Sequence, residues 1–235
     1  MNTYRTNAII VGVLFLIALI LNLIASGISD PILSAPDYLD KAYSNKTPII
    51  IGCLLNFICA VAMIFIPIVL FPVAKKFSVN LALGYVVFRF LEGVFFIYLA
   101  IKTLTFVSLS KAYISAEGQS AFYLQALGQS IQSEFHWAML VYITIFTLGA
   151  LTFYSLLFKS KLVPRFLSIW GILAAGVMVV AVMMGMFSMG IFNNMPLMQA
   201  MVYFAPPIAL NELTLSIWLI AKGFNASAIS VMAAK

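Results

Sequence analysis

Hydrophobic residues fall into six long runs, and the short segments between them carry most of the charged and turn-forming residues. A helix needs about 20 mostly apolar residues to cross the hydrocarbon core of a membrane, and each run reaches that length. Because backbone polar groups in hydrocarbon must be satisfied within the segment, the runs predict an all-α bundle. The predicted spans are residues 7–26, 47–71, 81–109, 135–158, 166–190 and 199–222.

The longest connecting segments are residues 27–46 and 110–134. Asp30-Pro31 in the first is typical of a turn. In the second, apolar residues at helical spacing predict a short helix lying on the membrane surface, with a lid over an entrance as the alternative. These apolar residues are Ala121, Leu124, Leu127 and Ile131. The other segments are too short for a soluble domain, so any site is expected in the bundle or beneath these two.

The composition supports one membrane domain over residues 1–235. Hydrophobic residues make up 64% of the chain and charged residues 9%, against about 25% charged in soluble domains. The mean hydropathy is +1.10. These values exclude a cytosolic enzyme, a disordered chain and a disulfide scaffold. The lipid bilayer is therefore the expected partner, and an oligomer is compatible with the sequence.

The net charge of +6 is explained by topology. The basic residues are scattered singly, so we expect no nucleic-acid partner. Cytoplasmic segments of membrane proteins are enriched in Lys and Arg, which predicts that both termini lie inside. The basic residues that then fall inside are Arg5, Lys75, Lys76, Lys159, Lys161, Arg165, Lys222 and Lys235, whereas the acids Asp30, Asp37, Asp40, Glu117 and Glu134 fall outside.

Three ionisable residues lie deep within predicted spans: Arg89, Glu92 and Glu212. Each such residue costs roughly 2.5–3.5 kcal/mol on insertion scales, so these residues usually face the bundle interior and pair. At about 1.5 Å per residue, all three lie roughly 13–18 Å from the inner surface. Arg89 and Glu92 share a helix face. We therefore predict that Arg89 contacts Glu212 if the third and sixth helices are neighbours, with Glu92 and Asn211 beside them.

This cluster has one acid more than it has bases, so one glutamate is expected to carry a proton or to meet a cation. Such an arrangement is typical of a proton- or cation-coupled transporter, and the alternative is a polar lock between two helices. Asn22 and Asn56 lie further out and either extend the polar layer or bond between helices.

The residues after the two membrane glutamates match at equal spacing. Glu92 precedes Ile97-Tyr98-Leu99 and Lys102, and Glu212 precedes Ile217-Trp218-Leu219 and Lys222. Three spans per half would make this a weak 3+3 inverted repeat, as in many secondary transporters. Pro206-Pro207, just before Glu212, either kinks the sixth helix or starts a broken one.

The single histidine excludes several enzyme classes. A zinc site needs several converging His, Cys or carboxylate ligands, and a bis-histidine haem needs two. We predict no catalytic residue, metal or cofactor, and we lean against an enzyme. His136 and Lys102 lie near the outer ends of their spans and are candidates for an outer gate.

Three motifs resemble one bacterial membrane family. Arg89-Phe90-Leu91-Glu92 is similar to its third-helix motif. Leu162-Val163-Pro164-Arg165, followed by Leu167-Ser168-Ile169-Trp170-Gly171, is similar to its junction between the fourth and fifth helices. Pro207-Ile208-Ala209-Leu210-Asn211-Glu212, with Trp218-Leu219-Ile220-Ala221-Lys222-Gly223-Phe224, is similar to its closing helix, although Asn211 is often Gln there. The family is domain of unknown function 4386. The resemblance implies an integral membrane fold without an assigned activity.

The sequence thus predicts a six-helix protein of the bacterial inner membrane. Its expected function is that of a small transporter or ligand-binding bundle for an unidentified small molecule or ion. Arg89, Glu92, Asn211 and Glu212 are the candidate ligand or proton site. The alternatives are a non-catalytic sensor, interaction or immunity-type protein with the cluster as a structural lock, and an intramembrane enzyme.

Overall fold

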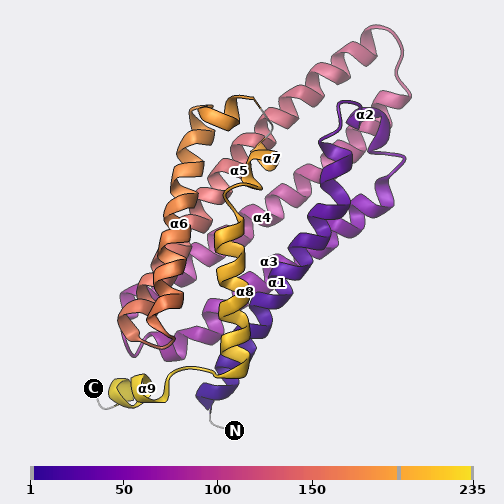
Figure 1. Ribbon diagram of the computed structural model, residues 1–235. Helices are drawn as coiled ribbons and strands as arrows, with labels where there is room; N and C mark the ends of the chain where they lie inside the picture. Colours follow the sequence, from indigo (N-terminus) through magenta and orange to yellow (C-terminus); the bar gives the residue numbers. More distant parts are fainter. Residues whose placement is uncertain (1–2, 195–196, 234–235) are drawn as a thin grey trace.

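The computed structural model describes residues 3–194 and 197–233, and this part of the chain is helical without any strand (Figure 1). Long apolar runs form the helices because each buries its own backbone hydrogen bonds. Ser78 caps one of them, since its hydroxyl accepts a hydrogen bond from the Leu81 N–H. The elements are α1 (Thr3–Leu33), α2 (Tyr38–Lys41), α3 (Lys46–Ala74), α4 (Val79–Ile114), α5 (Gln119–Ser160), α6 (Arg165–Met186), the 3-10 turn η1 (Gly190–Asn193), α7 (Leu197–Met201), α8 (Pro206–Ala221) and α9 (Ala226–Ala233).

Within the described residues, five helices are long and apolar enough to cross a membrane. These are α1, α3, α4, α5 and the segment Arg165–Asn193 that contains α6. The predicted sixth span, residues 199–222, is not one continuous helix. It is interrupted at 202–205, and its main part, α8, would be about 24 Å long, shorter than a hydrocarbon core of about 30 Å. Pro206 and Pro207 occupy the first positions of α8, where proline's missing N–H costs nothing.

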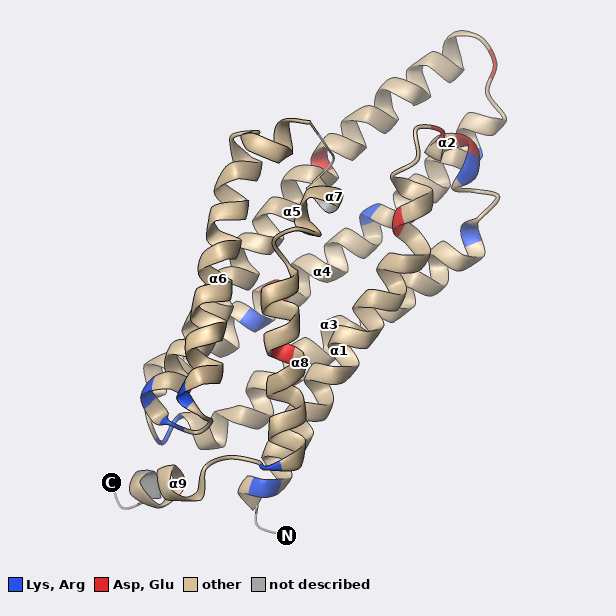
Figure 2. Ribbon diagram, viewed as in Figure 1, with Lys and Arg blue, Asp and Glu red and all other residues tan. Residues whose placement is uncertain are grey.

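The long helices form a closed circle in chain order. Each of α1, α3, α4, α5 and α6 packs on the next, and α8 closes the circle by packing on α6 and α1. Both chain ends lie at one end of this bundle, which we call the terminus end, and α2 lies toward the other, the α2 end (Figure 1). Figure 2 shows basic residues gathered at the terminus end and most acidic residues toward the α2 end.

Two helices extend further toward the α2 end than the sequence predicts. α1 continues through Asp30-Pro31 to Leu33, so this pair lies in the last turns of a helix. α5 begins at Gln119, so the short surface helix expected there is the start of α5 itself. Gly128 lets this part pack closely, because a Cβ at that position would lie 2.5 Å from the Tyr38 hydroxyl.

The core is densest toward the terminus end, where aromatic residues fill the circle. The Tyr85 ring of α4 stacks on Phe153 of α5 with centroids 4.6 Å apart, and both side chains are buried. Gly171 of α6 lies against the neighbouring Tyr154 so closely that a Cβ would sit 2.3 Å from the tyrosine ring. Glycine at this position lets α5 and α6 approach each other.

α8 is tied to α1 at the terminus end. The Arg5 guanidinium donates hydrogen bonds to the carbonyl oxygens of Leu219, Ile220 and Ala221 at 2.6–3.2 Å. These carbonyls belong to the last turn of α8, which has no further turn to satisfy them, and a cation there also complements the helix dipole. Arg5 therefore caps a helix more than 200 residues away in the chain.

We predict that Gly171→Ala destabilises the bundle, whereas Gly176→Ala on the same helix does not. The added methyl group at 171 meets the Tyr154 ring, while a Cβ at 176 meets nothing within 4 Å. Overpacking of this kind costs about 1–3 kcal/mol. Thermal unfolding of the two purified variants in detergent measures the difference. Equal midpoints would contradict the close packing of α5 on α6.

Candidate functional site

Arg89 of α4 is the centre of a buried ion cluster. Its Nη1 lies 3.0 and 3.1 Å from the two carboxylate oxygens of Glu92, one turn further along α4. Its Nη2 lies 3.4 Å from Oε1 of Glu212 on α8, and its Nε donates to the Tyr85 hydroxyl at 3.1 Å. The predicted contact between Arg89 and Glu212 is thus present, and Glu92 belongs to the same cluster.

The two carboxylates have different surroundings. The Glu92 side chain has no exposed surface, whereas 16% of the Glu212 side chain is exposed. Glu92 accepts two hydrogen bonds from one guanidinium nitrogen, whereas Glu212 has one long contact through Oε1. Within the described part of the chain, Oε2 of Glu212 accepts no hydrogen bond. Glu212 is therefore the acid that is free to meet a ligand.

The geometry of the cluster differs from the expectation in one respect. α4 and α8 are not packed directly on each other, because α4 packs between α3 and α5, and α8 between α6 and α1. Arg89 instead reaches across the inside of the circle to Glu212. This is possible because the guanidinium lies at the end of a long side chain.

Asn211 is buried next to Glu212 in sequence but faces another helix. Its Nδ2 donates to the Leu167 carbonyl of α6 at 3.0 Å, and its Oδ1 has no hydrogen-bond partner within the described residues. The side chain thus joins α8 to α6. Asn211 makes no hydrogen bond to Arg89 among the described residues, so its predicted role in ligand binding has no support from this cluster.

A cavity of about 420 Å³ lies inside the circle on the α2 side of the cluster. Arg89 and Glu212 form its floor, whereas Glu92 is not part of the lining. On α1 the lining runs from Phe15 to Leu33, which corresponds to about 27 Å along a helix axis. The cavity is therefore long and narrow, with the ion cluster at one end.

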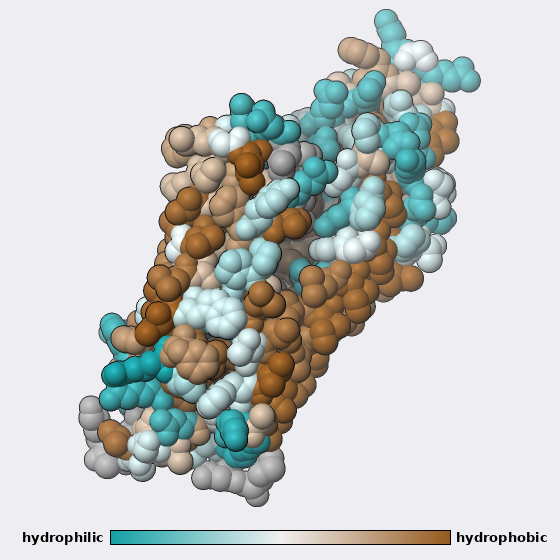
Figure 3. All heavy atoms as spheres, in the orientation of Figure 1, coloured by the Kyte–Doolittle hydropathy of each residue, from teal (hydrophilic) through white to brown (hydrophobic). Residues whose placement is uncertain are grey.

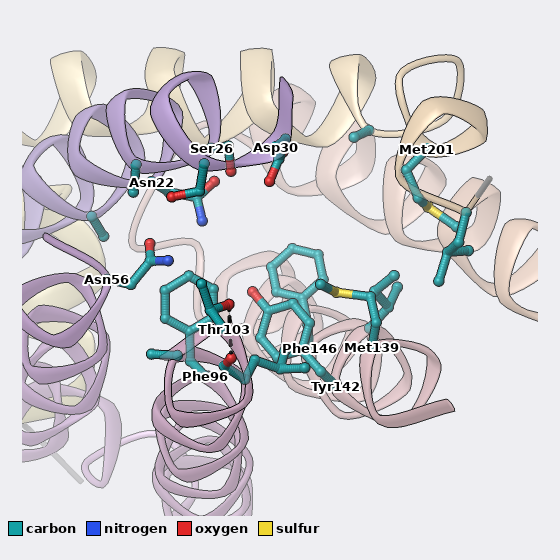
Figure 4. Close-up of a pocket in the computed structure, with 18 of the residues that line it drawn as sticks. Asn22, Ser26, Asp30, Asn56, Phe96, Thr103, Met139, Tyr142, Phe146 and Met201 are labelled. Carbon is teal, nitrogen blue, oxygen red and sulfur yellow. Dashed lines mark hydrogen bonds between the residues drawn. The ribbon is translucent and has the colours of Figure 1, made fainter. Parts of the chain in front are cut away.

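The two sides of this cavity differ in polarity (Figure 4). Asn22, Ser26 and Asp30 of α1 point into it, with Asn56 of α3 nearby. Aromatic and methionine side chains form the opposite side, which carries Phe96, Met139, Tyr142 and Phe146, and Met201 of α7 faces the cavity from beside α1. The sequence prediction included Asn22 and Asn56 but missed Ser26 and Asp30. Their four-residue spacing from Asn22 puts all three on one helix face, and this was the signal available.

The cavity lies beside the interruption at 202–205. α8 begins at Pro206, so on its α2 side the described residues between α6 and α1 are those of η1, α7 and the turn at 202–205. Figure 3 shows the molecular surface hollowed here, between α1 and the segment around α7. Leu197 and Met201 of α7 belong to the cavity lining.

The two candidate gate residues occupy different sites. His136 lines the cavity near its α2 end. Lys102 does not line it, because its Nζ lies 2.7 Å from Glu134 on the α4–α5 contact, where the Tyr98 hydroxyl also donates to Glu134. The hydrogen bonds of the described residues include none between His136 and a serine. The described residues also contain no group of three or more His, Cys, Asp or Glu side chains arranged to hold a metal ion.

An apolar helical bundle with several membrane-length helices and a charged cluster inside is a multi-pass integral membrane protein. A family model described as domain of unknown function (DUF4386) matches residues 10–223, and the chain therefore belongs to this family, as its motifs predict. Comparison with curated proteins found no match, and comparison with solved structures found none either.

We expect Glu92→Gln to lower the thermal stability of the protein more than Glu212→Gln. Without the Glu92 charge, buried Arg89 loses its closest carboxylate and its charge faces only the longer contact to Glu212, and breaking a buried ion pair typically costs about 3–5 kcal/mol. Without the Glu212 charge, Arg89 keeps both hydrogen bonds to Glu92. Thermal unfolding midpoints of the two variants in the same detergent test this prediction. A lower midpoint for Glu212→Gln would show that Glu212 contributes more to stability than Glu92.

Proposed function

We propose that this protein binds a small ligand inside the membrane and acts as a small transporter or ligand-binding bundle. The observation that carries the proposal is the cavity whose floor is formed by Glu212 and Arg89. Ionisable groups at membrane depth are costly and usually mark ligand or proton pathways. A long cavity ending on such groups has the form of a binding site.

In this proposal the two glutamates have separate roles. Glu92 neutralises Arg89 and holds it in place, because both of its oxygens are within 3.1 Å of one guanidinium nitrogen. Glu212 borders the cavity and is the group that exchanges a proton or meets the ligand. A broken helix beside an intramembrane acid is a recurring feature of secondary transporters, and α8 begins two turns before Glu212.

We further propose that the protein lies in the bacterial inner membrane with both termini in the cytoplasm. The basic residues at the terminus end support this orientation through the positive-inside rule. α7 and α8 would together form a sixth, interrupted span. The inverted 3+3 repeat would then relate α1, α3 and α4 to α5, α6 and α8, which matches the order in the circle.

A second candidate function is a non-catalytic sensor, interaction or immunity-type protein in which the cluster only locks helices together. The complete burial of Glu92 favours it. The two candidates differ in what they require of the cavity, because a lock needs no access from outside to the residues around Glu212.

Access to the cavity can be tested with a cysteine at Ala209, a cavity-lining residue one turn before Glu212. In the purified full-length protein, Ala209→Cys should react with N-ethylmaleimide under native conditions. The matched control is Ala174→Cys on α6, which is buried in the core and does not line the cavity. It should react only after unfolding. Wild type provides the background, since Cys53 and Cys59 are both buried. A native Ala209→Cys protein as unreactive as Ala174→Cys would favour the lock.

The orientation has its own test with a pair of exposed serines at opposite ends of the bundle. Ser120 lies at the start of α5 and Ser230 in α9. In spheroplasts, a membrane-impermeant maleimide should label Ser120→Cys, whereas Ser230→Cys should be labelled only after lysis. The opposite pattern would reverse the proposed topology, independently of whether the cavity binds a ligand.

A further inference from the structure

We propose that the ligand of this cavity is a lipophilic organic cation, bound with its charge at Glu212. The inference rests on the proposed function, because it concerns the same cavity and names the chemical class of its ligand. Its basis is the distribution of charge and of aromatic surface along the lining.

The charges of the lining favour a positive ligand. Three lining residues are Asp, Glu or Arg, and two of them are acids: Asp30, Arg89 and Glu212. The charge of Arg89 is balanced by Glu92, which lies outside the cavity and accepts two of its hydrogen bonds. Glu212 shares Arg89 with Glu92 through one contact of 3.4 Å, and Asp30 makes no side-chain ion pair or hydrogen bond within the described residues. An anionic ligand would meet two carboxylates and an arginine that is already neutralised.

The apolar side identifies the cation as an organic one. The faces of aromatic rings attract cations, and lipophilic cations combine this attraction with burial of apolar surface. The cluster already uses this contact, since the Arg89 guanidinium carbon lies 5.4 Å from the Phe15 ring centroid and 6.0 Å from that of Phe146. Methionine side chains are flexible and adapt to ligands of different shape, and Met139 and Met201 face the cavity (Figure 4). The described residues contain no group of three or more His, Cys, Asp or Glu side chains that could hold a metal ion instead.

The two acids lie at different depths and thus have different roles. Asp30 is fifteen residues along α1 from Phe15, which contacts the cluster, so it lies about 22 Å nearer the α2 end. It would attract the cation at the mouth of the cavity. Glu212 would hold it at the floor, beside the aromatic rings.

Tetraphenylphosphonium and tetraphenylborate test this inference, because the two ions have nearly the same shape and opposite charge. Their binding to the purified full-length protein is measured by equilibrium dialysis, with protein-free micelles as the blank. The phosphonium ion should bind about tenfold more tightly or better, the size of effect expected for a contact with a buried charge. Equal binding of the two ions, or tighter binding of the borate, would overturn the inference.

Variants then locate the charge. Glu212→Gln should weaken phosphonium binding about tenfold and remove most of the discrimination between the two ions. Asp30→Asn should weaken it less, and it provides a second variant if Glu212→Gln unfolds. The matched control is Glu117→Gln in the exposed turn between α4 and α5, which should bind like wild type. Unchanged phosphonium binding in Glu212→Gln would refute the assignment of the charge to Glu212.

The outcome separates this inference from the proposed function. If neither ion binds while Ala209→Cys is reactive, the ligand class is wrong and the accessible cavity stands. If neither ion binds and Ala209→Cys is unreactive, both proposals fail.

Discussion

The pairing of Arg89 with two carboxylates is the constraint on which the inner structure of the bundle depends. A guanidinium in the membrane interior must be neutralised where it lies, and Glu92 on the same helix does this. The second acid, Glu212, is on a helix that does not pack on α4. The side chain of Arg89 therefore crosses the inside of the circle and separates it into two parts. A dense aromatic core lies on the terminus side, and the cavity lies on the other side.

The order of the helices explains why such a cavity forms. Six elements around a circle leave a central space that side chains must fill, and Tyr85, Phe153 and Tyr154 fill it toward the terminus end. Toward the α2 end one member of the circle is incomplete, because α8 starts only at Pro206. The proline pair thus has two effects on the fold. It starts α8, and it leaves no long helix beside the cavity on the α2 side of Pro206.

The sequence predicts the membrane class, the first five helices and the contact of Arg89 with Glu212, because these follow from apolar length and from the cost of isolated charge. It does not predict which helices are neighbours, since apolar helix faces look alike in sequence. The extension of α5 depends on Gly128 fitting against Tyr38, a contact between segments far apart in the chain. Asp30 was assigned to a loop because Asp-Pro usually marks a turn, yet Pro31 is accommodated near the end of α1. Asp30 was missed as a cavity residue for that reason.

The cap that Arg5 forms on α8 has a mechanical consequence. It fixes α8 to α1 at the terminus end, while the opposite end of α8 follows directly on the turn at 202–205. A helix that is fixed near Leu219 can tilt about that point, and Glu212 lies about 10 Å along α8 from it. A tilt of α8 leaves the contact between Arg89 and Glu92 unchanged, because both residues belong to α4. The 3.4 Å contact between Arg89 and Glu212 is the link of the cluster that such a tilt would stretch.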